Sequence, residues 1–332
     1  MKWVGLILCI IIMLVLPACN GKLSPAIEHL NQGDAYYLQQ QWVEALNEYD
    51  KAKELDPALD VDSKMAQVYF ERARSYDIEN EYEDVITDCC KALELDPALE
   101  PGMVLAIAYN SRGRQYSEQE EWELAKADFQ KAIEIYPNFA VAHSNLAGVY
   151  FAQENWDAVY QTLNKVIELS PDNYDAHLSK SWACYELREF DTALESANKA
   201  VELGPDRAVS YFLRGTIYRE IRELDAALED YSIAIELDPD YAAAYNDRTV
   251  VYMSKGEWKL ALADLEKIIQ FSPDYPLAYH NRAVCYFNRT LYDLAITECT
   301  IALDLMQGDP NWAWLEEETI KLKRKAEIHD RF

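Results

Sequence analysis

Cysteine and histidine are the residues with which this chain could bind a metal ion or carry out nucleophilic chemistry. Its 332 residues include seven cysteines and five histidines. No two cysteines are spaced as C-x-x-C, which excludes a zinc ribbon and a thioredoxin-like redox site. The histidines are too scattered for an obvious metal cluster, at His29, His143, His177, His280 and His329. The sequence therefore predicts no metal site and no cofactor.

Two of these histidines, His143 and His177, occupy the same place in consecutive units of a repeating pattern described below. Two imidazoles on neighbouring helices could share a metal ion, but no carboxylate or third ligand accompanies them. We therefore interpret both as packing residues with a polar tip.

The sequence lacks the motifs of the commonest enzyme active sites. It has no G-x-S-x-G, no G-x-x-x-x-G-K-[ST], no G-x-G-x-x-G and no H-E-x-x-H. Its 31 Lys and Arg against 58 Asp and Glu give a net charge of −27, which opposes binding to the phosphates of nucleic acid. The sequence predicts neither an enzyme nor a nucleic-acid-binding protein.

Arginine recurs at one place of the repeating pattern, at Arg214, Arg248 and Arg282. Such a row could bind an anionic ligand. In so acidic a protein, we expect instead that the aliphatic stems pack and the guanidinium groups pair with nearby Asp and Glu.

Three cysteines, Cys89, Cys184 and Cys299, occupy places that hold larger apolar residues elsewhere in the pattern, so we expect small buried side chains there. A disulfide between Cys285 and Cys299 is an alternative in an oxidising compartment, and their oxidation state stays open.

The N-terminus has the pattern of a targeting signal. Lys2 precedes an unbroken apolar run, 3–15, which is short for a membrane span and suits a signal peptide. Leu16-Pro17-Ala18-Cys19 follows and resembles the lipobox of bacterial lipoproteins. This resemblance implies a signal peptide over 1–18, lipidation of Cys19 and a short tether over 19–25. An uncleaved anchor and ordinary secretion are the alternatives.

Prolines recur with a regular period through the rest of the chain. Seven of them belong to this series, at Pro57, Pro97, Pro137, Pro171, Pro205, Pro239 and Pro273. The last four intervals between them are identical, and the first two are slightly longer. Tyrosines follow the same spacing, as at Tyr218, Tyr252 and Tyr286. The pattern resembles the tetratricopeptide repeat (TPR), a pair of helices that recurs with a period of about 34 residues.

Within one period, apolar residues are spaced by three and four, as on one face of a helix, in two successive stretches. Each helical hairpin has an apolar face that it cannot bury alone, so neighbouring hairpins must stack. We expect an all-α, right-handed solenoid over 26–307 and a capping helix over 311–329, in which Trp312, Trp314 and Leu315 cover the last hairpin. The eight predicted repeats are 26–57, 66–97, 106–137, 140–171, 174–205, 208–239, 242–273 and 276–307.

In TPR proteins the first helices of the hairpins line a groove that binds peptides or segments of partner proteins. The resemblance therefore implies groove residues on the first helix of the later repeats. The candidates are Phe151, Leu178, Trp182, Tyr185, Phe212, Arg219, Asn246, His280, Asn281 and Phe287. Aromatic rings would anchor such a peptide, and amides would bond its backbone.

These features predict a non-enzymatic scaffold for a protein or peptide partner. It would be lipid-anchored in a bacterial envelope, on the outer side of the cytoplasmic membrane or at the outer membrane. It resembles envelope TPR lipoproteins of pilus assembly, secretion and outer-membrane biogenesis, without indicating which. Two alternatives are an accessory to an envelope enzyme that binds a glycan or small ligand, and a self-associating structural protein.

Overall fold

The computed structural model describes residues 23–76, 81–100, 102–307 and 309–330. The predicted signal peptide, 1–18, and Cys19 lie outside these residues, as does most of the predicted tether. The described residues form helices and no strand, and they belong to two compact units that divide after Pro137.

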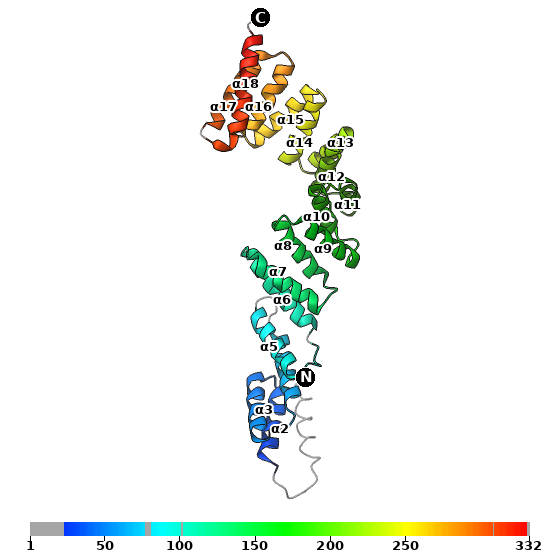
Figure 1. Ribbon diagram of the computed structural model, residues 1–332, viewed down its shortest axis with the longest axis vertical. Helices are drawn as coiled ribbons and strands as arrows, with labels where there is room; N and C mark the ends of the chain where they lie inside the picture. Colours follow the sequence, from blue (N-terminus) through cyan, green and yellow to red (C-terminus); the bar gives the residue numbers. More distant parts are fainter. Residues whose placement is uncertain (1–22, 77–80, 101, 308, 331–332) are drawn as a thin grey trace. The chain divides into compact units, whose positions relative to one another are not determined.

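Unit 1, Met1–Pro137, contains three helix pairs. Figure 1 shows them in blue to green. The pairs are α2 (Pro25–Leu38) with α3 (Trp42–Leu55), α4 (Asp62–Ser75) with α5 (Tyr82–Leu95), and α6 (Gly102–Glu118) with α7 (Trp122–Ile135).

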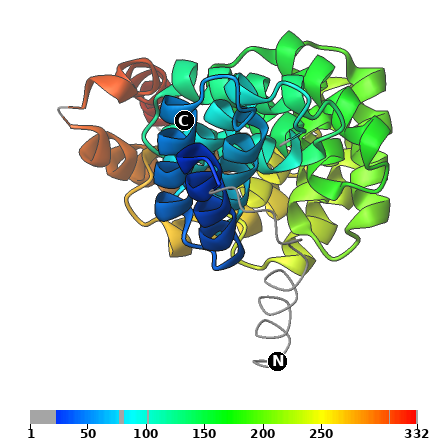
Figure 2. The ribbon, with the colours of Figure 1, turned by 90° about the horizontal axis from the view of Figure 1, so that it is seen from below.

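Unit 2, Asn138–Phe332, contains five pairs and a final helix. Its successive pairs are rotated relative to one another, as the end-on view in Figure 2 shows. The pairs are α8 (Ala140–Ala152) with α9 (Trp156–Leu169), α10 (Tyr174–Glu186) with α11 (Phe190–Leu203), α12 (Ala208–Glu220) with α13 (Leu224–Leu237), α14 (Ala242–Ser254) with α15 (Trp258–Phe271), and α16 (Pro276–Asn288) with α17 (Tyr292–Met306). A 3₁₀ turn, Pro310–Trp312, leads into α18 (Ala313–His329).

The turns explain why the helices begin and end where they do. In seven hairpins the second helix ends two residues before one of the periodic prolines. The residue before a proline disfavours helical dihedrals, and proline has no N–H to donate, so the helix cannot continue. Within seven hairpins, one residue between the two helices has a positive φ, which reverses the chain. These residues are Gln40, Glu120, Glu154, Arg188, Arg222, Gly256 and Thr290.

Close contact between paired helices depends on a small residue facing a large ring. A Cβ atom on Gly33 would lie 2.6 Å from the ring of Tyr49, so a larger residue there requires movement. Gly215 faces Tyr231 in the same way, at 3.0 Å, and Tyr231 is completely buried. The prediction of an all-α solenoid of helical hairpins with a C-terminal helix is confirmed.

The C-terminal helix differs from the prediction in one respect. Leu315 is buried against Tyr279 and Met306, and Trp312 packs against the same cluster. Trp314 is 59% exposed, so the prediction that it covers the last hairpin was wrong. Because the 3₁₀ turn sets the register in which α18 begins, Leu315 faces the hairpin and Trp314 faces away.

Five hairpins contain a buried ion pair between an arginine of the first helix and an acid at a fixed distance along the chain on the second. Four of these pairs are bidentate, with donor–acceptor distances of 2.6–2.9 Å. They are Arg72–Asp88, Arg112–Asp128, Arg214–Asp230 and Arg248–Asp264, and the fifth is Arg282–Glu298, with Nη2 2.8 Å from Oε2.

Each of these arginines also lies over at least one tyrosine ring, and Arg112, Arg214 and Arg248 each lie over two. The guanidinium carbon of Arg248 lies 5.6 Å and 5.7 Å from the ring centroids of Tyr245 and Tyr252, which are close enough for cation–π attraction. Hydrogen bonding to Asp230 raises the pKa of Arg214. The expectation that Arg214, Arg248 and Arg282 pair with acids is confirmed, so these guanidinium groups do not form a free anion site.

Candidate binding face

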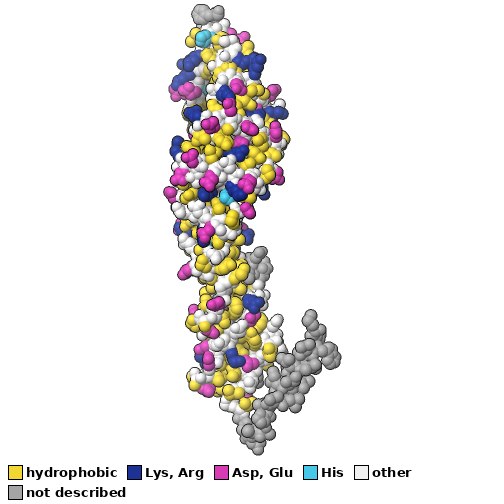
Figure 3. All heavy atoms as spheres, turned by 90° about the vertical axis from the view of Figure 1, so that its right-hand side faces the viewer, with side chains coloured by type: hydrophobic (Ala, Val, Ile, Leu, Met, Phe, Trp, Pro, Cys, Tyr) yellow, Lys and Arg dark blue, Asp and Glu magenta, His cyan; other side chains and the backbone are white. Residues whose placement is uncertain are grey.

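The first helices of unit 2 form the face on which the candidate binding residues lie. We call it the first-helix face, and it comprises α8, α10, α12, α14 and α16. Helix α12 contacts α10 on one side and α14 on the other, so its residues share a surface with theirs. On the side of the molecule shown in Figure 3, acidic side chains are scattered among basic and apolar ones and form no single patch.

The three candidates on α10 are half-buried and pack against the core. Leu178, Trp182 and Tyr185 contact a cluster that includes Leu213 and Ile217 of α12. The ring centroids of Trp182 and Tyr185 lie 6.2 Å apart. Burial raises the pKa of Tyr185. These side chains are therefore partly exposed at the surface and partly engaged in helix packing.

The candidates on α12 contact residues at the start of α14 and within it, through a ring contact and an ion pair. The ring centroids of Phe212 and Tyr241 lie 5.0 Å apart. Arg219 Nη1 is 3.0 Å from a carboxylate oxygen of Asp247, and Asn246 donates a weak hydrogen bond of 3.5 Å to the other. Arg219 is thus already neutralised by this chain, which makes it a poor site for a second anion.

The candidates on α16 lie against the C-terminal helix. His280 Nδ1 is 2.8 Å from Thr319 Oγ1, and burial lowers the pKa of His280. Phe287 contacts His329 edge-on, with 5.8 Å between ring centroids, and Asn281 is half-buried on the same helix. Helix α18 therefore covers His280 and Phe287, and the open part of the face spans α8 to α14.

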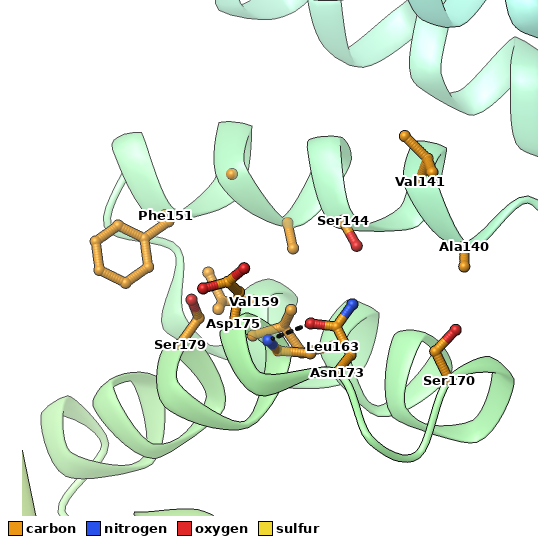
Figure 4. A pocket seen from close by; sticks show the side chains of 13 residues that line it. Ala140, Val141, Ser144, Phe151, Val159, Leu163, Ser170, Asn173, Asp175 and Ser179 are labelled. Atoms are coloured by element: carbon orange, nitrogen blue, oxygen red, sulfur yellow. Dashed lines mark hydrogen bonds between the residues drawn. The ribbon is translucent and has the colours of Figure 1, made fainter. Parts of the chain in front are cut away.

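A pocket of about 520 Å³ opens between α8 and α10, with α9 as its floor. Figure 4 shows Phe151 at one end and Ser144 facing α10 across the pocket. Phe151 was predicted from the sequence, but the rest of its helix face, which continues through Val141, Ser144 and Gly148, was not. Their spacing by three and four places them on the same helix face as Phe151, so the sequence itself contains the signal.

Other exposed apolar residues on this face were also missed. Val209 on α12 and Val250 on α14 are 40% and 43% exposed. Val250 occupies the same place in its repeat as Trp182 does two repeats earlier, and Val209 occupies the same place as Val141. The period alone could therefore have placed both valines on the first-helix face.

The candidate metal residues do not form a site among the residues that the structure describes. No group of three or more His, Cys, Asp or Glu side chains is placed there to hold a metal ion. His177 Nε2 lies 2.9 Å from the carbonyl oxygen of Pro171, so its polar tip has a local partner.

The buried cysteines have thiols of low reactivity. Cys89, Cys184, Cys285 and Cys299 are buried and free. Burial raises the pKa of Cys285 and Cys299 to about 12, and that of Cys184 to about 11. Because the thiolate is the reactive form, these thiols are poor nucleophiles near neutral pH.

None of the helices in the described ranges combines the length and the apolar character that a membrane crossing requires. The apolar run 3–15 lies outside those ranges.

Comparison with solved structures shows which proteins share this fold. The chain resembles YrrB, described as "a TPR protein with an unusual peptide-binding site", at 26% identity and a TM-score of 0.50, over 61% of this chain and 97% of that one. It also resembles PilF of Pseudomonas aeruginosa, at 18% identity and a TM-score of 0.54, over 64% of this chain and 97% of that one. The APC/C hetero-tetramer Cut9–Hcn1 matches at 16% identity and a TM-score of 0.51, over 90% of this chain and 55% of that one.

Comparison with curated protein sequences gives no match. Five family models, all described as tetratricopeptide or TPR repeats, match residues 26–59, 66–99, 106–139, 161–208 and 215–256. These matches span both units and more than half of the chain, so the protein belongs to the tetratricopeptide repeat family.

Proposed function

We propose that this protein is a membrane-anchored interaction scaffold, which binds a segment of a partner protein along the open part of the first-helix face. One observation carries the proposal: the first helices expose apolar side chains on the same face as an open pocket between α8 and α10. Val141, Val209 and Val250 are between 40% and 53% exposed. An apolar pocket together with exposed apolar side chains on one face is typical of a surface that binds a ligand or another protein.

The chemistry of this face favours binding over catalysis. Arg219 is neutralised by Asp247, and the recurring arginines are paired inside their hairpins. The likeness to YrrB, a TPR protein with a peptide-binding site, supports a peptide-like ligand. The likeness to PilF supports the fold alone, so pilus assembly, secretion and other envelope processes stay equal candidates.

The binding face can be tested with substitutions that leave the core intact. Alanine at Trp182 or Phe212 would also remove packing, because both rings are half-buried. We expect glutamate at both Val209 and Val250 to reduce crosslinked partner capture from the native membranes by about tenfold or more, since each charge would be buried under the partner.

The matched control places glutamate at Leu237 and Leu260, which are 40% and 48% exposed on second helices. Circular dichroism checks that both double variants stay folded. Equal capture by the two variants would contradict the first-helix face as the binding surface. If light scattering instead shows an assembly that grows with concentration and that the valine variant abolishes, the partner is a second copy of this chain.

The membrane anchor rests on the apolar run and the lipobox, and we propose that Cys19 carries the lipid. Cys19→Ala is expected to move the protein from the membrane fraction to the soluble fraction and to abolish its metabolic labelling by a fatty acid. Cys9→Ala serves as the control, because that cysteine lies within the predicted signal peptide. A Cys19→Ala protein that stays in the membrane would instead identify 3–15 as an uncleaved anchor.

A further inference from the structure

The pocket between α8 and α10 exists because α8 has small side chains at places where α10, the first helix of the next repeat, has large ones. Ser144 and Gly148 line it, and the residues at the same places in the next repeat are Leu178 and Trp182. A Cβ atom on Gly148 would meet nothing within 4 Å, in contrast to the glycines that face tyrosine rings. This glycine is therefore not required by helix packing, and it leaves space open to a ligand.

The walls of the pocket suit a large apolar side chain. Val159 and Leu163 form the floor, Ala147 and Ala176 the sides, and the exposed ring of Phe151 one end. A volume of about 520 Å³ lies within the range of roughly 300–1,000 Å³ in which proteins hold small ligands and anchoring groups. An aromatic ring placed there would also meet Phe151 edge-on or offset, as aromatic pairs prefer.

The pocket has a single charged group, the carboxylate of Asp175. No Lys, Arg or His is among its lining residues. In Figure 4 the carboxylate of Asp175 rises from α10 into the space toward α8, beside Ser179. Asp175 is exposed and has no ion-pair or hydrogen-bond partner among the described residues, whereas Asn173 is occupied in capping α10 through the backbone nitrogen of Ala176 at 2.9 Å.

We propose that this pocket takes an aromatic or other large apolar side chain of the partner segment, and that Asp175 pairs with a lysine or arginine next to that side chain. The net charge of −27 favours the approach of a basic segment. The inference rests on the proposed function, and it names the kind of sequence that the first-helix face selects.

The test uses the full-length protein in detergent as bait for a displayed library of random dodecapeptides. We expect the selected peptides to place an aromatic residue within two positions of a lysine or arginine. Gly148→Leu fills the pocket without a backbone clash, and it should weaken binding of a selected synthetic peptide by about tenfold or more. Asp175→Asn should weaken it about three- to tenfold and reduce its salt dependence.

Charge reversal gives a result that a general loss of structure cannot mimic. Asp175→Lys is expected to select peptides that carry Asp or Glu where the wild type selects Lys or Arg. Gly102→Leu is the matched glycine control, because a Cβ atom there also meets nothing within 4 Å and the residue lies in unit 1. Asp157→Asn, at an exposed carboxylate on α9, is the matched charge control.

The outcomes separate this inference from the proposed function. Peptides that lack the aromatic and basic pair, or that bind Gly148→Leu as tightly as wild type, would overturn the pocket assignment and leave peptide binding intact. If the wild type selects no peptide at all, both the pocket assignment and the proposed peptide binding fall.

Discussion

Asp264→Ala is expected to lower the free energy of unfolding of unit 2 by about 3–5 kcal/mol, the usual cost of removing one partner from a buried ion pair. The carboxylate of Asp264 is 6% exposed and accepts bonds of 2.9 Å and 2.7 Å from Arg248. Burial raises the pKa of Asp264, and the arginine beside it opposes that effect. Without the carboxylate, Arg248 keeps its charge in a half-buried site and has only Ser232 as a hydrogen-bond partner.

Urea denaturation followed by circular dichroism measures this loss, and hydrogen exchange should localise it to α14 and α15, because each hairpin of a solenoid contacts only its neighbours. Glu168→Ala is the control, since Glu168 forms an exposed pair with Lys165 and should change stability by less than about 1 kcal/mol. Arg248→Met combined with Asp264→Leu should recover most of the stability. If Asp264→Ala and Glu168→Ala lower the free energy of unfolding equally, the buried pairs contribute no more to stability than an exposed pair does.

Leu315→Ala is expected to destabilise the C-terminal helix by about 2–5 kcal/mol, as truncating a buried leucine does elsewhere. Leu315 is completely buried against Tyr279, Ala302 and Met306, so alanine would leave a cavity under α18. The loss should appear as faster hydrogen exchange in α18. Because α18 also covers His280 and Phe287, we expect its release to increase self-association in light scattering.

The neighbouring residue supplies the control for this prediction. Trp314 is larger than Leu315 but 59% exposed, so Trp314→Ala should change stability by less than about 0.5 kcal/mol. If the two alanine variants exchange at the same rate in α18, the helix is not held by its buried face.

Much of the fold is predictable from the sequence because each hairpin obeys local rules. Proline shortly beyond a helix ends it wherever the chain is placed, and the regular period of the repeats places the next hairpin. The pairing of the arginines is also predictable. The spacing from Arg248 to Asp264 recurs between arginine and aspartate in three other hairpins, so even the partner could be read from the sequence.

The candidate site is only partly predictable for a physical reason. Helical periodicity identifies the face of a helix, as it did for Phe151 and Trp182, but it does not show what lies opposite that face. His280 and Phe287 have the same place in their repeat as residues of the open face, yet α18 lies against them. The register of α18 depends on a 3₁₀ turn that lies outside the repeats, so the repeat period could not predict it.

The all-α class, the succession of hairpins, the buried charge pairs and the family can all be read from the amino acids, because these features depend on neighbours close along the chain. Which residues of the first-helix face stay open, and where a cavity remains, follows instead from how separate helices pack. A pocket is the space that side chains from several helices fail to fill. Ser144 and Gly148 line one only because α9 and α10 hold α8 at a fixed distance.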